Sequence, residues 1–120
     1  MADFMLLIKG GNPDHRLSPE EMQQDMQKWG EWMDRLAKAG HLKGGAPLEK
    51  GGKLVTGPKA IITDGPFPEV KDLVGGYLLL QAKDVDEAAM IAQGCPIFGE
   101  TQHQNPNVPA SLEIRPIGKM

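Results

Sequence analysis

The stretch Tyr77-Leu78-Leu79-Leu80-Gln81-Ala82 decides the fold of this 120-residue chain. Successive side chains of a strand point to opposite faces of a sheet, and this stretch places apolar side chains on both faces. The expected strand 3–9, with Phe4-Met5-Leu6-Leu7-Ile8, shows the same pattern. We therefore expect a sheet whose two faces are both covered.

A helix is expected over residues 19–39, with a full set of start and stop signals. Ser18 is suited to be its N-cap, Pro19 takes the first helical position, and Glu21 can complete a capping box. Gly40 is placed to end the helix in a left-handed turn. We favour core packing for its apolar stripe, although the methionines and the tryptophan could instead line a pocket between helix and sheet. The stripe consists of Met22, Met26, Trp29, Met33, Leu36 and Ala37.

The other elements complete the order β–α–β(ββ)–β–α–β. We expect strands at 41–48, 53–56, 60–63 and 111–115, the first interrupted by Gly44-Gly45, and a second helix capped by Asp84. Two helices on one face of a mostly antiparallel sheet give an α+β, ferredoxin-like split βαβ domain over residues 1–120. A second copy packed sheet to sheet would cover the other face, so a homodimer is expected.

Composition excludes some classes of partner. Formal net charge is −3, and the 13 Lys and Arg residues form no basic run, which argues against nucleic acid. Nothing approaches the roughly 20 apolar residues of a membrane span, so no membrane partner is expected. The one cysteine, Cys95, can form no intrachain disulfide and is expected to be a small buried residue. A reducing compartment, the cytoplasm, fits this cysteine usage.

The segment Asp64-Gly65-Pro66-Phe67-Pro68-Glu69-Val70-Lys71-Asp72 is the richest in chemical groups. Its glycine permits a sharp turn and its prolines stiffen the chain. Such a loop can fix Asp64, Glu69 and Lys71 beside a pocket. A plain surface turn in which Asp64 caps its own backbone is the alternative, and composition alone favours that alternative.

The same segment carries a family resemblance. Asp64-Gly65-Pro66-Phe67, followed by Glu69, Lys71 and Gly75-Gly76-Tyr77, resembles the signature of the YCII-related family, the DGPF group in particular. Matching stretches at 4–7, 18–22, 29–40, 84–96 and 113–116 extend the resemblance over nearly the whole chain. It implies a ferredoxin-like fold that dimerises as an α+β barrel. For function, the resemblance implies one of two classes. Some members of the family resemble enzymes of aromatic degradation with a His–Asp pair, and others are encoded beside sigma factors of the extracytoplasmic-function type.

Within this resemblance Asp64 matches the acidic member of the pair, but the signature contains no histidine. His15, His41 and His103 compete for the partner role, and an imidazole beside a carboxylate is the usual general-base arrangement. Solvated loop histidines are the simpler interpretation. Their spacing fits no zinc pattern, so no metal site is expected, and the sequence identifies no cofactor.

We hypothesise that the dimer binds a small organic molecule in a cleft edged by the loop at 64–72. Aromatic molecules belong to the class of ligands considered. Proton-transfer chemistry, an elimination or isomerisation, would use Asp64 and His15. The expected binding residues are Phe67, Glu69, Lys71 and Arg115, although Arg115 could simply pair with Glu113 on its strand face. The alternative is a non-catalytic ligand-binding or regulatory module that uses the same cleft.

Overall fold

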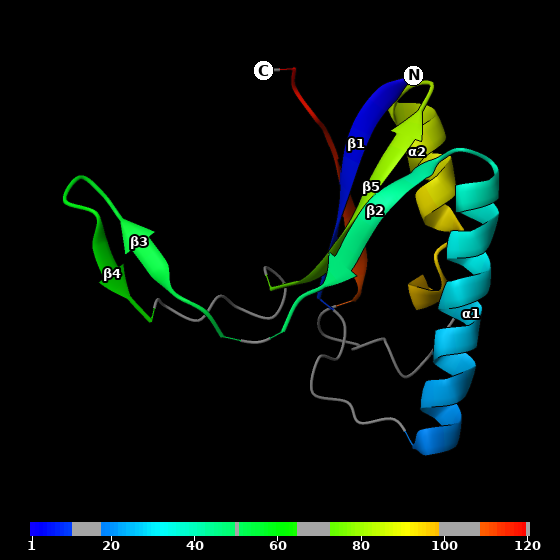
Figure 1. The fold of residues 1–120 in the computed structure, drawn as a ribbon, viewed down its shortest axis with the longest axis horizontal. Helices are drawn as coiled ribbons and strands as arrows, with labels where there is room; N and C mark the ends of the chain where they lie inside the picture. The colour runs from blue at the N-terminus through cyan, green and yellow to red at the C-terminus, as the bar shows by residue number, and fades with distance from the viewer. Residues whose placement is uncertain (11–17, 50, 65–72, 99–108, 120) are drawn as a thin grey trace.

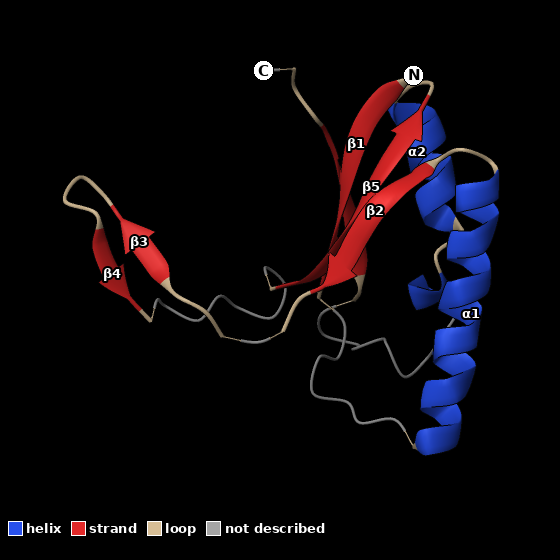
Figure 2. Cartoon of the chain, viewed as in Figure 1, coloured by secondary structure: helices blue, strands red, loops and turns tan. Residues whose placement is uncertain are grey.

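The computed structural model describes residues 1–10, 18–49, 51–64, 73–98 and 109–119. A sheet carries both helices on one face, and a separate hairpin projects from its other side (Figures 1 and 2). In chain order the elements are β1 (Ala2–Lys9), α1 (Pro19–Lys38), β2 (Leu42–Pro47), β3 (Leu54–Thr56), β4 (Ile61–Thr63), β5 (Val74–Ala82), α2 (Val85–Gln93), the 3-10 turn η2 (Pro96–Phe98) and β6 (Ser111–Pro116). In this part of the chain, no helix combines the length and the apolar character that crossing a membrane requires.

The main sheet has four strands in the order β2-β5-β1-β6, and every neighbouring pair is antiparallel. The two strands that were expected to be apolar on both faces, β1 and β5, lie side by side at its centre. With one helix after β1 and the other after β5, this is the split βαβ arrangement. The prediction of an α+β, ferredoxin-like fold is confirmed.

The register of β1 against β5 assigns each apolar side chain to a face. Leu6 lies opposite Leu78, and both are buried on the face that the helices cover. Met5 lies opposite Leu79, one position along each strand, so these two side chains point to the other face. We call that second face the outer face, and Met5 and Leu79 are only partly buried on it.

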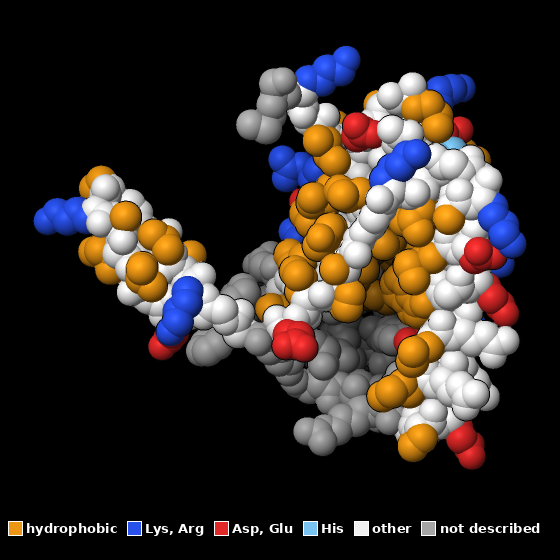
Figure 3. Space-filling model, in the orientation of Figure 1, with side chains coloured by type: hydrophobic (Ala, Val, Ile, Leu, Met, Phe, Trp, Pro, Cys, Tyr) orange, Lys and Arg blue, Asp and Glu red, His pale blue; other side chains and the backbone are white. Residues whose placement is uncertain are grey.

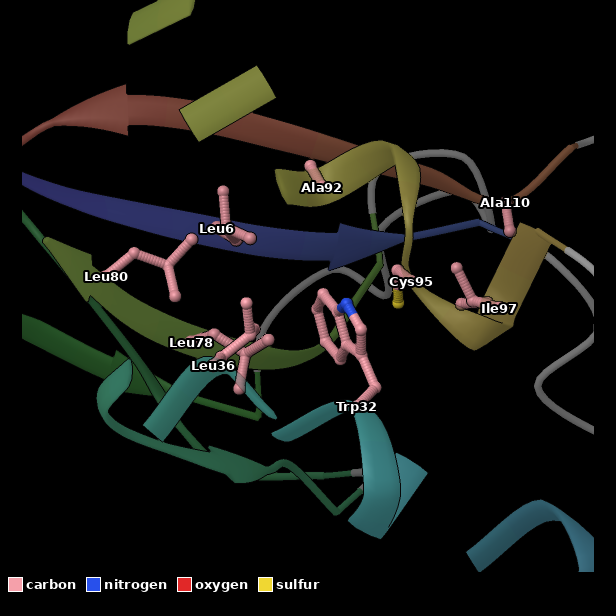
Figure 4. Packing of buried hydrophobic residues seen from close by; sticks show 9 residues of the cluster. All are labelled: Leu6, Trp32, Leu36, Leu78, Leu80, Ala92, Cys95, Ile97 and Ala110. Atoms are coloured by element: carbon pink, nitrogen blue, oxygen red, sulfur yellow. The ribbon is translucent and has the colours of Figure 1, made fainter. Parts of the chain in front are cut away.

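The core forms where the inner face of the sheet meets α1 and the segment after α2. Leu6 and Leu80 are its most completely buried large side chains, at 0% and 1% exposure. Figure 4 shows them converging with side chains from the helical side of the molecule. The remaining members of the cluster are Trp32, Leu36, Leu78, Ala92, Cys95, Ile97 and Ala110.

Helix α1 begins and ends with the predicted signals. The Ser18 hydroxyl accepts a hydrogen bond from the Glu21 amide at 3.1 Å, and the Glu21 carboxylate accepts one from the Ser18 amide at 3.1 Å. Gly40 follows the cap residue Ala39 with a φ of +81°, which favours glycine. The expected span 19–39 is therefore correct to within one residue.

The prediction that the whole stripe of α1 packs in the core is wrong. Leu36 is buried, but Met22 and Met26 are 51% and 68% exposed. Trp29 is only partly buried, whereas Trp32, which the predicted stripe omitted, is 4% exposed. Positions 32 and 36 are one turn apart on the row that faces the sheet, while position 29 lies on a neighbouring row beside it.

Strand β2 continues through Gly44-Gly45, although an interruption was expected there. Its register shifts between Leu42 and Gly44, and Gly45 has a φ of +155°. A Cβ atom at Gly45 would lie 2.5 Å from the carbonyl oxygen of Tyr77 and 2.7 Å from Leu78 Cδ2. Glycine at this position therefore permits β2 to approach β5 closely.

Because Trp32 is a large aromatic side chain buried in the core, we expect Trp32→Ala to lower the free energy of unfolding by about 3–5 kcal/mol. Urea unfolding followed by circular dichroism measures this loss. Met90→Ala is a matched control, since Met90 is 72% exposed and its truncation should cost no more than about 0.5 kcal/mol. Equal losses for the two variants would contradict the core assignment.

The capping box should contribute a separate, smaller term. Ser18→Ala removes the acceptor for the Glu21 amide, and we expect it to lower the free energy of unfolding by about 1 kcal/mol. Ser18→Asn keeps a side-chain acceptor, so it should stay close to the parent in the same urea titration. A Ser18→Ala protein as stable as Ser18→Asn would show that the cap contributes nothing.

Candidate functional site

A pocket of about 650 Å³ lies between α1 and β2, on the inner side of the sheet. Figure 3 shows this hollow with hydrophobic side chains on its walls. Its described lining residues are Ile8, Asp25, Met26, Trp29, Met33, Leu42, Gly44, Gly45, Ala46, Pro47, Gly75, Tyr77, Leu78 and Ile97. The helix thus supplies one wall, and β2, β1 and β5 supply the other.

The helix wall of the pocket is formed by the row of α1 side chains next to the buried row of Trp32 and Leu36. Met26, Trp29 and Met33 recur at helical spacing and all line it. The ring of Trp29 meets the buried ring of Trp32 edge to face, with centroids 5.8 Å apart and an interplanar angle of 82°. Because the core fixes Trp32, this contact helps to hold Trp29 at the pocket wall. Trp29 and Met33 therefore both line the pocket and pack against the core, whereas Met26 is exposed at the pocket wall.

Asp25 is the only acidic side chain among the described lining residues. It lies four residues before Trp29, so it belongs to the same face of α1. Its negative charge also acts on Cys95, since burial and then the charge of Asp25 raise the pKa of that thiol to about 11. Cys95 is 3% exposed and stays protonated at neutral pH, which confirms the prediction of a small buried residue.

Asp64 lies outside this pocket in the described structure. It follows β4, its side chain is 79% exposed, and its carboxylate accepts a hydrogen bond from the ammonium group of Lys53. Strand β4 belongs to the projecting hairpin and is exposed along its length, so within one chain the Asp64 carboxylate does not lie at the edge of the core. The ion pair shows one partner that Asp64 binds within its own chain.

Several predicted site residues lie outside the described residues: His15, Phe67, Glu69, Lys71 and His103. Their assignment to the site stays a prediction. Asp64 is therefore the single member of the signature tetrad 64–67 that the structure describes.

His41 has a hydrogen bond that explains its place in the fold. Its ring Nδ1 lies 2.8 Å from the carbonyl oxygen of Gln81, which can only accept, so Nδ1 carries the proton. The backbone carbonyl of His41 accepts in turn from the Gln81 amide at 2.7 Å. These bonds join the start of β2 to β5, and Figure 1 shows this part of the sheet far from the β3–β4 hairpin.

Arg115 lies on the outer face of the sheet, opposite Met5 across β1 and β6. Its guanidinium approaches the Glu113 carboxylate at 3.5 Å, and Lys9 approaches the same carboxylate at 3.3 Å. The hydrogen bond from Lys9, followed by its charge, lowers the pKa of Glu113. The simpler interpretation of Glu113 and Arg115 as an ion pair agrees with this geometry, and Arg115 does not line the pocket.

Metal binding has no support in the described part of the chain, where no three His, Cys, Asp or Glu side chains cluster as ligands. The sequence interpretation also missed the carboxylate that does line the pocket. Helical periodicity could have identified Asp25. It lies four residues before Trp29 and eight before Met33, so it is an acidic residue on their otherwise apolar face of the helix.

Comparison with known proteins places the chain in a family. None of the curated proteins matches it. One similar solved structure is 5-chloro-2-hydroxyhydroquinone dehydrochlorinase (TftG) from Burkholderia phenoliruptrix AC1100, in complex with 2,5-dihydroxybenzoquinone. It is 14% identical, with a TM-score of 0.47, over 93% of this chain and 90% of that chain. The profile of the YCII-related domain matches residues 3–117, nearly the whole sequence, and the chain therefore belongs to the YCII-related family.

Proposed function

We propose that this protein binds a small organic molecule in the pocket between α1 and β2. The observation that carries the proposal is the pocket itself, whose volume of about 650 Å³ falls within the roughly 300–1,000 Å³ typical of small-molecule sites. Its walls are mostly apolar, and they come from rigid elements of the fold. A pocket of this kind favours a ligand that is itself largely apolar.

The composition of the helix wall favours an aromatic ligand. Trp29 presents a ring held by its contact with Trp32, and aromatic rings stack against one another or meet edge to face. Met26 and Met33 add thioether groups, which adapt to irregular shapes and make favourable contacts with rings. These three side chains supply contact area without requiring a polar ligand.

Asp25 supplies a polar group for orientation. Carboxylate oxygens accept hydrogen bonds, so a ligand hydroxyl is a suitable donor to Asp25. A hydroxylated aromatic molecule, such as a phenol or hydroquinone, satisfies both the apolar wall and this acceptor. The ligand class that we propose is therefore hydroxylated aromatic compounds.

Proton-transfer chemistry on this ligand forms the second part of the proposal. It assigns Asp64 and His15 as the acid–base pair, with Phe67, Glu69 and Lys71 as binding residues. It leaves out Arg115, which lies on the outer face and not at the pocket. The resemblance of the segment after β4 to the DGPF signature supports this part. A non-catalytic binding or regulatory module is the second candidate, and the described pocket favours it because its lining contains one carboxylate and no histidine.

We also propose that the protein works as a cytoplasmic homodimer. Met5, Leu7 and Leu79 lie on the outer face, which neither helix covers in Figure 2. A second copy of the chain can cover this face with an apolar surface of its own. The buried free thiol of Cys95 suits a reducing compartment.

Ligand binding can be tested with the neutral aromatic probe N-phenyl-1-naphthylamine, whose fluorescence rises in apolar sites. Met26→Glu places a charge at the pocket wall, and we expect it to weaken probe binding by about tenfold or more. Met22→Glu is the matched control, on the same helix, exposed, and absent from the described lining. Equal affinities of the two variants for the probe would reject the pocket as the binding site.

Asp64→Asn tests the chemistry. It removes the charge with little change in shape, and the exposed ion pair with Lys53 contributes no more than about 1 kcal/mol, so the fold should persist. If Asp64 is functional, the variant should melt normally but lose binding or turnover in a panel of phenols and hydroquinones. A variant that melts normally, and that binds and converts every compound as the parent does, would show that Asp64 is not part of the site.

A further inference from the structure

The β3–β4 hairpin exposes aliphatic side chains on both of its faces. Val55 and Ile62 lie opposite each other and are 58% and 68% exposed. On its other face, Leu54 and Ile61 are 38% and 56% exposed. Thr56 and Thr63 share this second face, so it is mixed, whereas the face of Val55 and Ile62 is apolar and exposed to solvent.

Nothing in the described part of the chain covers these side chains. The two strands pair only with each other, and Figures 1 and 3 show the hairpin standing away from the sheet on the side opposite the helices. An isolated two-stranded hairpin is marginally stable in water, and an exposed apolar patch of this kind marks an interaction site. The hairpin therefore offers an apolar surface that a partner could bury.

The outer face of the sheet also presents apolar side chains that neither helix covers. Met5, Leu7 and Leu79 lie on it, and the hairpin projects from the same side of the sheet. Because the hairpin points away from its own sheet, these two apolar surfaces do not meet within one chain. Two copies related by a two-fold axis would bring each hairpin to the outer face of the other, since such an interface uses the same patch twice.

We propose that the β3–β4 hairpin is an intermolecular clamp that packs its aliphatic side chains on the outer sheet face of a second copy of this chain. This inference rests on the homodimer proposed above. The hairpin from Leu54 to Thr63 supplies ten residues, and the outward-facing positions of β1, β5 and β6 supply about ten more, which reaches the lower end of the roughly 20–30 residues a side of a standard interface. The surface is thus large enough for a stable dimer.

Sedimentation equilibrium on the full chain tests the clamp. The parent should be a dimer at micromolar concentration, and Ile62→Asp should raise the dimer dissociation constant by about tenfold or more, because the interface would bury a charge. Met90→Asp is the matched control, since Met90 is equally exposed but lies on α2, on the helical side. It should dimerise as the parent does.

A labelling experiment keeps the proposal testable should Ile62→Asp fail to fold. Ile62→Cys introduces a reactive thiol, while the native Cys95 is buried, with its pKa raised to about 11, and competes little for the reagent. An acrylodan label at position 62 should emit at shorter wavelength in the dimer and shift to longer wavelength on dilution. The same label on Met90→Cys should show no such shift.

The outcomes separate the clamp from the other proposals. A dimeric parent with Ile62→Asp as tightly associated as Met90→Asp, or a label at 62 insensitive to dilution, would overturn the clamp and leave the dimer standing. A parent that is monomeric throughout would overturn both the dimer and the clamp. Probe binding by N-phenyl-1-naphthylamine reports separately on the pocket in all of these proteins.

Discussion

The pairing of β1 with β5 is the constraint on which the rest of the structure depends. With Leu6 opposite Leu78 and Met5 opposite Leu79, the two central strands present apolar side chains to both faces. A slip of one residue would exchange the faces, so burial of Leu6 at 0% exposure fixes the register. Because α1 and α2 cover only one face, the same ladder that forms the core also leaves an apolar outer face.

The pocket follows from the way α1 meets this sheet. Trp32 and Leu36, in the C-terminal half of the helix, make the buried contact, while the N-terminal half extends past the end of the sheet (Figure 1). The adjoining row, which includes Trp29, is then left beside a space rather than against a strand. Gly45 draws β2 close to β5, so that β2 forms the opposite wall of this space. Packing of the Trp32 and Leu36 row against the sheet thus leaves the neighbouring row, with Trp29, at the wall of the pocket.

Groups capable of chemistry are distributed over three separate regions of the molecule. Asp25 lies in the pocket, Glu113 lies on the outer face with Lys9 and Arg115, and Asp64 lies beside the hairpin with Lys53. Within the described chain these carboxylates do not share a site. The proposed ligand binding needs only the pocket, whereas the proposed acid–base chemistry also needs residues beyond the described ones. A dimer held by the hairpin would give the region around Asp64 a partner surface.

Local sequence signals determined much of this protein. The capping box at Ser18, the turn at Gly40 and the alternation in β1 and β5 depend on neighbouring residues, and each predicted its element correctly. Tertiary packing decided which row of α1 is buried. Periodicity shows that a helix has apolar rows, but the choice between Trp29 and Trp32 depends on where the sheet lies against it. For the same reason the pocket around Asp25 and the exposure of the hairpin appeared only in three dimensions, since both arise between segments distant in sequence.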